Sequence, residues 1–150
     1  MENLEISKKT CALSFKDQNS CLLLEGNKEY NVNMSLQAYI NYNCEYYGSS
    51  FEGRIKGAKK SLGMKYKLPI VIEESREIVF FPTKSYNSEK CTWISLNNIS
   101  KYEGNSKKTI ITFNSGIKKQ YDISIESFEN QMLRATKLLL TLKNRKLELK

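Results

Sequence analysis

Residues 49–74 read SSFEGRIKGAKKSLGMKYKLPIVIEE, and the spacing of the apolar side chains changes within this stretch. Before Pro69 they recur every three or four positions, which predicts an amphipathic helix. Ser49 and Glu52 match an S-x-x-E capping box at its start, and Gly63 is placed to end it. After Pro69 the short apolar run PIVIEE is typical of a strand. The stretch therefore predicts a helix followed by strands within one fold.

The helix predicted after Ser49 has one apolar side and one basic side. Lys56 and Lys60 share the basic side with Gly53 and Gly57, so that a partner could approach the backbone closely between two ammonium groups. Each interior glycine costs about 1 kcal/mol relative to alanine, which leaves a partly irregular segment as the alternative. The apolar side consists of Phe51, Ile55, Ala58 and Leu62.

The sequence before this stretch predicts a hairpin and another helix. The runs TCALSF (10–15) and SCLLLEG (20–26) flank KDQN as paired strands would, and EYNVN (29–33) is expected as a third strand. The segment SLQAYINYNCEYYG (35–48) carries apolar residues at helical spacing. Ser35 is its expected N-cap, and Gly48 lies beyond its end.

After Pro69 the chain alternates strands and turns, and then forms a long helix over residues 124–146 that Ser124 or Ser127 caps. The pattern predicts an α+β fold, with a mainly antiparallel sheet, two short helices in the first half and a long amphipathic helix near the C-terminus. The strands after Pro69 are expected in PIVIEE (69–74), REIVFFPT (76–83), TWISLNNISKYEG (92–104), KKTIITFNSG (107–116) and IKKQYDI (117–123), with a hairpin turn at 114–116.

The long helix carries two apolar rows, although packing on one sheet requires only one. The first row steps by three and four residues and is expected to face the core. A second row, formed by Leu133, Leu140 and Leu147, belongs either to the core or to a dimer contact. The first row consists of Phe128, Met132, Ala135, Leu139 and Leu142.

Length and composition fit one folded domain over residues 1–150, with 40% hydrophobic residues. The N-terminal MENLEISKK has no apolar run behind it, which argues against a secretory signal peptide. Apolar runs fall far short of the ~20 residues that span a bilayer. We therefore expect a cytoplasmic protein that does not enter a membrane.

The sequence offers no catalytic or metal site, and no cofactor is expected. It contains no histidine, which excludes Ser-His-Asp and Cys-His arrangements. Its four cysteines form no CxxC pair and are interpreted as buried thiols. Gly48 and Gly53 have the spacing of a phosphate-binding loop, but Arg54–Ile55 stands where Lys–Ser/Thr is required. Glu73 and Glu74 are interpreted as solvated surface carboxylates, so the chain is not expected to be an enzyme.

The net charge of +8 is concentrated in two segments. Residues 50–70 hold six basic residues and one acid, and residues 134–150 do the same, whereas residues 1–48 hold four lysines and six acids. Clustered positive charge indicates a polyanionic partner, because each phosphate contact releases counterions. The high Lys and Asn content of an AT-rich genome accounts for the overall basicity, but it explains the clustering less well.

The basic segment Tyr46–Lys67 is therefore the primary candidate for DNA contact, and a solvated loop is the alternative. Two short helices, the second one basic, match a helix-turn-helix weakly. Arg54 is the expected base reader or minor-groove probe, because guanidinium groups favour narrow AT-rich grooves. Lys107–Lys108 and Lys118–Lys119 are secondary candidates, whereas Trp93 is expected in the core. The tyrosines of the segment either stack on bases or bury their rings.

Several blocks of the sequence, taken in order, resemble the ComK family, the competence transcription factors of low-GC Gram-positive bacteria. The similarity extends from about Asn33 to Leu142. The most specific blocks are the aromatic-Gly-Ser-Ser-aromatic-x-Gly-Arg-x-x-Gly pattern at 47–57, FFPT and SFENQ. The others are KLPIVI, CTWIS and TFNSG.

The resemblance implies a DNA-binding activator of the late competence genes for DNA uptake, located in the cytoplasm on the nucleoid. It also implies recognition of paired AT-rich boxes through the minor groove by dimers that assemble in pairs, with RNA polymerase as a further partner. The matching basic block is carried over, and its assignment to DNA comes from its charge. The expected DNA-binding residues are Arg54, Lys56, Gly57, Lys59 and Lys60, with Lys65 and Lys67 adjoining them.

Familiar members of that family carry a longer C-terminal tail, through which an adaptor delivers them to a Clp protease. The present sequence stops at KNRKLELK, so neither that control nor a tail-dependent activation function is expected. The competing hypothesis is a protein-interaction module that keeps the dimerising helix and modulates a full-length relative. An exposed basic block favours DNA binding, and a block masked by acids favours the interaction module.

Overall fold

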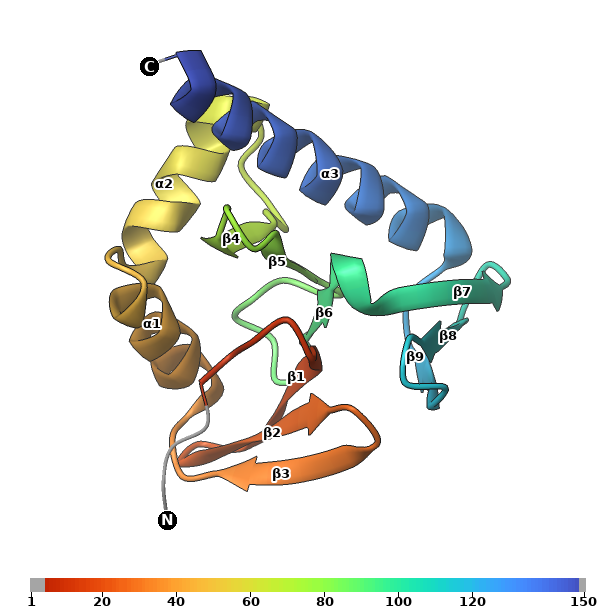
Figure 1. Ribbon diagram of the computed structural model, residues 1–150. Coiled ribbons are helices and arrows are strands. Elements are labelled where there is room, and N and C mark those ends of the chain that lie inside the picture. Colours follow the sequence, from red (N-terminus) through yellow and green to blue (C-terminus); the bar gives the residue numbers. More distant parts are fainter. Residues whose placement is uncertain (1–4, 149–150) are drawn as a thin grey trace.

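The computed structural model of the protein describes residues 5–148 and has the predicted α+β architecture (Figure 1). Its helices are α1 (Leu36–Tyr46), α2 (Phe51–Leu62) and α3 (Ile125–Glu148), with a 3₁₀ turn at Leu96–Asn98. Its strands are β1 (Thr10–Asp17), β2 (Ser20–Glu25), β3 (Lys28–Val32), β4 (Ile70–Glu73), β5 (Ile78–Pro82), β6 (Thr92–Ser95), β7 (Ile99–Gly104), β8 (Thr109–Phe113) and β9 (Lys118–Tyr121).

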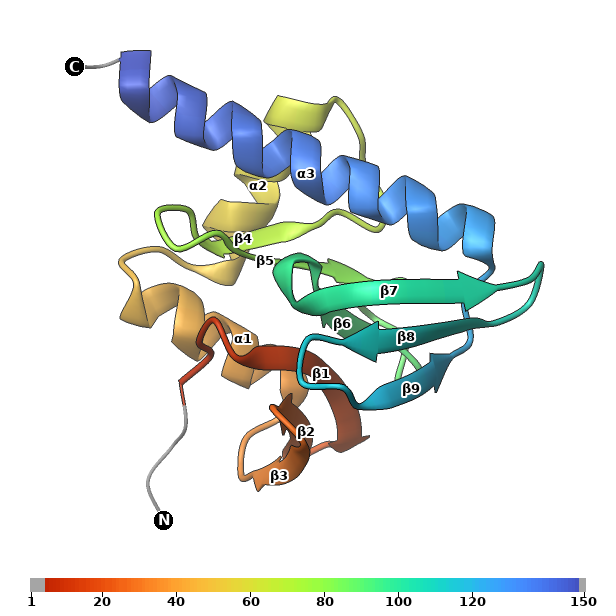
Figure 2. The ribbon, with the colours of Figure 1, turned by 45° about the vertical axis from the view of Figure 1, so that its right-hand side comes forward.

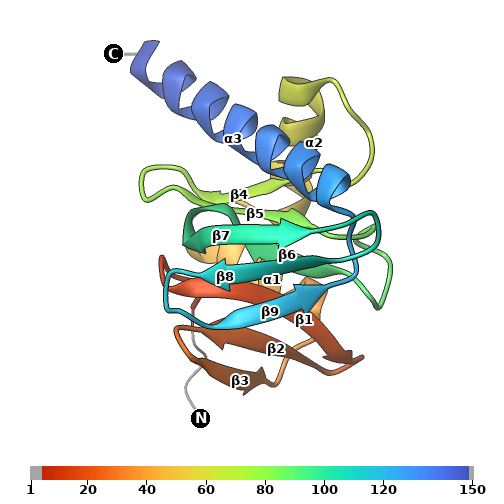
Figure 3. The same cartoon turned by 90° about the vertical axis from the view of Figure 1, so that its right-hand side faces the viewer.

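The described strands form two antiparallel sheets. Six of them are ordered β3-β2-β1-β6-β5-β4, and β7-β8-β9 form a separate three-stranded sheet. Helices α1 and α2 cover one side of the larger sheet, and the smaller sheet lies on its other side (Figures 1 and 3). Helix α3 runs across β4 and β5 and reaches α2 (Figure 2). The long helix thus touches both the sheet and the second short helix.

The boundary between α1 and α2 differs by one residue from the sequence prediction. Ser50, not Ser49, caps α2, because its Oγ accepts a hydrogen bond from the Gly53 amide at 3.0 Å. The amide of Ser49 is still engaged with the preceding helix and donates to the Cys44 carbonyl at 2.8 Å. Ser49 therefore finishes α1, and the predicted capping box with Glu52 is wrong.

Helix α2 is regular despite its two interior glycines. Phe51, Ile55 and Ala58 are buried on one side, as their spacing predicted, and Gly63 ends the helix in the left-handed conformation at φ +66°. Burial of that apolar side outweighs the propensity cost of the glycines. The alternative of a partly irregular segment is therefore wrong.

The second apolar row of α3 lies in solvent. Leu133, Leu140 and Leu147 are 69%, 52% and 63% exposed, so the prediction that they belong to the core is wrong. The core face of the helix is formed instead by Phe128, Ala135 and Leu139, together with Leu138 and Gln131. These face the sheet in one stripe, and the exposed row lies roughly opposite to it. The role of the row as a dimer contact stays a prediction.

The core contains the residues expected there. Trp93 is buried on β6, and its ring meets Phe51 edge-on. All four cysteines are buried and form no disulfide. Ser124 caps α3, since its Oγ accepts from the Ser127 amide at 3.1 Å. Within residues 5–148, no helix has the length and apolar character needed to cross a membrane.

Candidate nucleic-acid interface

The two basic segments of the sequence lie side by side where the C-terminal ends of α2 and α3 meet (Figure 1). Arg145 donates to the Ser61 hydroxyl at 2.9 Å, and Gln131 donates to the Lys67 carbonyl at 3.0 Å. The chain between Ser61 and Lys67 is therefore held to α3 at two places. Gln131 and Arg145 lie almost four turns apart, about 21 Å along the helix axis. This length corresponds to about six base pairs of DNA.

A buried carboxylate, Glu74, lies between the same two helices. Its carboxylate forms one ion pair with Arg54 of α2, at 3.1 Å, and a second one with Lys146 of α3. Its side chain is 7% exposed, so the prediction of a solvated surface group is wrong for this residue. Burial raises the pKa of Glu74, but the hydrogen bond from Lys146 and the charge of Arg54 outweigh it, and the pKa lies below its usual range. Glu74 therefore stays ionised and links α2 to α3.

The ion pair with Glu74 engages Arg54, the residue that was expected to read DNA. The Arg54 side chain is only 18% exposed and its guanidinium faces Glu74. A base reader or groove probe must project into solvent, which Arg54 does not do here. Its geometry fits a structural cation better, while its role in DNA binding stays a prediction.

The basic residues of α3 fall into two groups. Lys143 pairs with Glu77 at 2.9 Å, and Lys146 pairs with Glu74, both on the side of the helix that faces the β4–β5 turn. Arg134, Lys137 and Arg145 make no ion pair with a carboxylate of the described residues within 4.0 Å. Arg134 and Arg145 lie on the side that contacts Ser61 and Lys67. Only this second group is left with uncompensated charge.

The remaining candidates on α2 and its connection to β4 are exposed. Lys59, Lys60, Lys65 and Lys67 project from the chain without an acidic partner among residues 5–148. Lys56 is exposed as well, but it pairs with Glu52 one turn earlier at 3.0 Å. An exposed pair of this kind is worth little and opens readily when a phosphate competes.

We call the exposed cations without a described acidic partner the α2–α3 basic surface. Gly57 adds to its α2 side, because a Cβ built there would meet no atom within 4 Å. Such a surface binds the phosphate backbone by charge, without reading sequence. Its members are Lys59, Lys60, Lys65, Lys67, Lys137 and Arg145, and the half-buried Arg134 adjoins them.

The secondary candidates do not adjoin this surface. Lys107 and Lys108 lie in the turn between β7 and β8, and Lys118 and Lys119 begin β9 at the opposite end of β8. The smaller sheet that carries them is separated from α2 by the larger sheet (Figure 1). Lys108 is also paired with Asp122 at 3.5 Å. The two lysine pairs therefore lie at opposite ends of β8.

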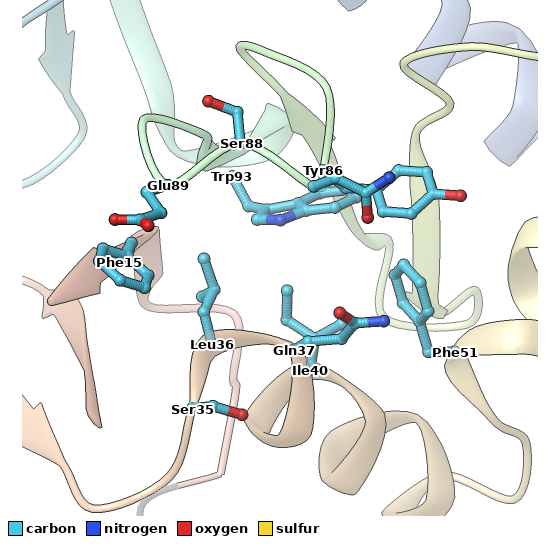
Figure 4. Close-up of a pocket in the computed structure, with 11 residues that line it drawn as sticks. Phe15, Ser35, Leu36, Gln37, Ile40, Phe51, Tyr86, Ser88, Glu89 and Trp93 are labelled. Carbon is cyan, nitrogen blue, oxygen red and sulfur yellow. The ribbon is translucent and has the colours of Figure 1, made fainter. Parts of the chain in front are cut away.

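An aromatic groove of about 240 Å³ opens between α1 and the segment that joins β5 to β6 (Figure 4). Trp93 and Tyr86 form one wall, the first turns of α1 form the opposite wall, and Phe51 closes one end. Glu89 is the one carboxylate among its lining residues, and no cation lines it. The described residues contain no cluster of three acids or cysteines that could hold a metal. The groove thus lacks the paired groups that general acid–base chemistry requires.

Sequence reasoning missed the residues that organise the surface. Glu74 ends a strand next to Glu73 and gives no signal of its burial. The sequence gives a clearer signal of burial for Gln131, because this residue falls on the apolar stripe of α3, three residues after Phe128 and four before Ala135. A polar residue at such a position is buried and needs hydrogen-bond partners.

Comparison with known proteins identifies a family and a curated relative. The model of a family described as ComK protein matches residues 1–147. The chain is 32% identical over 113 residues to a curated protein of Bacillus subtilis (strain 168), named competence transcription factor. The alignment covers 75% of this chain and 59% of that relative, so the chain spans less than two thirds of its relative's length. No solved structure matches the chain.

Proposed function

Because this chain belongs to the ComK family, we propose that it is a DNA-binding transcriptional activator of competence genes, the genes for DNA uptake. The observation that carries the proposal is the α2–α3 basic surface, in which two distant basic segments combine while Glu74 and Glu77 neutralise the cations on the other side of α3. The protein acts in the cytoplasm on the nucleoid, as a single domain and without catalysis.

The proposed partner is double-stranded DNA with paired AT-rich boxes, bound through the minor groove. A narrow AT-rich groove attracts guanidinium groups. Arg54 is engaged with Glu74, so we assign the role of groove probe to Arg145, which is exposed beside Ser61. Lys59, Lys60 and the cations of the α2–β4 connection hold the phosphates on either side. This mode differs from a helix-turn-helix, in which a recognition helix enters the major groove.

A salt titration of DNA binding tests the proposal. Fluorescence anisotropy compares a duplex with two AT-rich boxes and a GC-rich duplex, using wild type and the double variant Lys59→Gln/Lys60→Gln. Loss of two phosphate contacts makes the slope of log K against log salt shallower by about 1.8. The matched control, Lys16→Gln/Lys28→Gln, removes two exposed charges from the β1–β3 hairpin and should keep the wild-type slope. Equal slopes for all three proteins would contradict the proposed surface.

A second candidate function is favoured by the exposed row Leu133, Leu140 and Leu147. Leucines at seven-residue spacing on a long helix suit packing against another helix. In this reading the chain is an interaction module that pairs with a relative and modulates it. The row equally serves an activator that works as a dimer or a pair of dimers, with RNA polymerase as a further partner. Preference for the AT-rich duplex separates the two, because a module that only pairs with proteins shows none.

A further inference from the structure

A small polar pocket lies where α3 passes the α2–β4 connection. Its volume is about 120 Å³, room for several waters and thus for one phosphate group. The lining includes two cations, Lys67 and Arg134, and the polar side chains of Thr83, Ser127 and Asn130. No carboxylate lines the pocket. A cavity with donors and positive charge but no acid is chemically suited to an anion.

One buried side chain contacts both residues, Lys67 through its main-chain carbonyl and Arg134 through its guanidinium. Gln131 is 2% exposed, and its Nε2 donates to the carbonyls of Lys67 at 3.0 Å and Pro82 at 2.8 Å. Its Oε1 accepts from Arg134 Nη1 at 3.0 Å. The amide thus satisfies two buried carbonyls and fixes the Arg134 guanidinium at the same time. A guanidinium held in this way keeps its other donors available for a ligand.

The backbone at the pocket is held in an unfavourable conformation. Lys67 has φ +51°, the left-handed region that a residue with a Cβ seldom adopts. Strain of this kind persists where surrounding contacts enforce it, and it is enriched at functional sites. Here the enforcing contact is the bond from Gln131 to the Lys67 carbonyl. Both residues line the same cavity, so an anion in it would meet two positive charges.

We propose that this pocket is a phosphate-binding seat, in which Arg134 and Lys67 hold one backbone phosphate of DNA. The assignment to DNA rests on the proposed function above, whereas the recognition of phosphate rests on the pocket alone. Arg134 was not among the DNA-binding residues expected from the sequence. The seat extends the contact along α3 from Arg145 to Arg134, on the same side of the helix.

Arg134→Gln tests the seat through the salt dependence of DNA binding. Loss of one phosphate contact makes the slope of log K against log salt shallower by about 0.9 and weakens binding about eightfold at 0.1 M salt. Arg134→Lys keeps the charge and should keep the slope. Lys28→Gln, an equal charge loss on β3 at the far end of the molecule, should behave as wild type (Figure 1). Circular dichroism checks that each variant is folded.

An NMR titration with inorganic phosphate tests the pocket without DNA, with chloride at equal ionic strength as the control. Phosphate should shift the amide signals of Ser127, Asn130 and Arg134 in wild type and leave Arg134→Gln unchanged. If wild type binds DNA and Arg134→Gln shows the same salt slope and the same affinity, the proposal that the pocket holds a DNA phosphate is wrong. If wild type binds no DNA, the proposed function is wrong, and the phosphate titration alone decides whether the pocket binds phosphate. Shifts then support a seat for free phosphate, and their absence overturns the seat.

Discussion

Replacing Glu74 with methionine is expected to destabilise the fold by about 2–3 kcal/mol. The change leaves the partly buried Arg54 without its counter-charge, and breaking a fully buried ion pair in this way costs about 3–5 kcal/mol. Two features of the structure reduce the expected loss of stability below this range. Lys146 is 63% exposed and is readily solvated when its partner is lost. Among the described residues, Arg54 Nε and Glu74 Oε2 also make no hydrogen bond, so the pair is not bidentate.

A double-mutant cycle isolates the ion pair from the rest of the change. Arg54→Met leaves Glu74 paired with Lys146 and should cost about 1 kcal/mol. The double variant should cost less than the sum of the single changes by about 1–2 kcal/mol, because the exposed Lys146 is then the one charge of the group that remains, and water solvates it. Urea unfolding is followed by the fluorescence of Trp93, the one tryptophan, which is buried in the core. Thermal midpoints should move by about 2–4 °C per kcal/mol.

The exposed pair of Glu52 with Lys56 provides the matched control. Glu52→Gln should change the free energy of unfolding by less than about 0.5 kcal/mol, because exposed pairs contribute little. Equal costs for Glu52→Gln and Glu74→Met, or strictly additive costs for Arg54 and Glu74, would refute the structural role of the pair. If the pair is structural, any weaker DNA binding by an Arg54 variant has to be corrected for its loss of stability.

The same ion pair makes the stability dependent on pH. The folded-state pKa of Glu74 is lowered, so its contribution is present above the unfolded-state pKa, about 4.3, and is lost as the pH falls through the folded-state value. The free energy of unfolding of wild type should therefore exceed that of Glu74→Gln at neutral pH, and this difference should disappear below about pH 4. An advantage that stays constant through this range would contradict the lowered pKa.

Three further predictions follow from the structure. Lys67→Gly relieves the positive φ and should raise the free energy of unfolding by about 0.5–1 kcal/mol while weakening DNA binding; a loss of stability in urea would contradict the strain. Burial raises the pKa of Cys21 and Cys44 to about 11, so iodoacetamide at pH 8 should modify them only in the unfolded chain, as mass spectrometry would detect. Leu133→Lys/Leu140→Lys should leave the thermal midpoint within about 2 °C, because both side chains are exposed, and should dissociate any dimer seen by sedimentation velocity; an unchanged dimer would exclude the row as its contact.

The local patterns of the sequence determined the elements of this fold. Apolar spacing predicted the three helices of the described residues and the hairpins because burial on one face imposes a period of 3.6 on a helix and 2 on a strand. The single strand expected over 92–104 is wrong, since a 3₁₀ turn at Leu96–Asn98 divides it into β6 and β7 of different sheets. Turn and cap residues such as Ser35, Gly63 and the NSG turn at 114–116 act on backbone groups within a few residues of themselves, so they can be recognised without the fold. The cap of α2 was misplaced by one residue because Ser49 and Ser50 are chemically equivalent there. The hydrogen bond from the Ser49 amide to the Cys44 carbonyl, at the end of α1, distinguishes them.

The charge pattern of the sequence predicted a polyanionic partner, but the tertiary structure decided which cations are free to bind one. Arg54 and Lys146 are 92 residues apart (146 − 54), and a single buried carboxylate neutralises both. Lys67 and Arg134 are also remote in sequence, yet Gln131 contacts both of them at one pocket without an acid. Clustering along the chain is a property of composition. Whether a charge is paired, buried or exposed depends on which distant groups the fold places within a few ångströms, because Coulomb energy depends on distance in space and on the local dielectric.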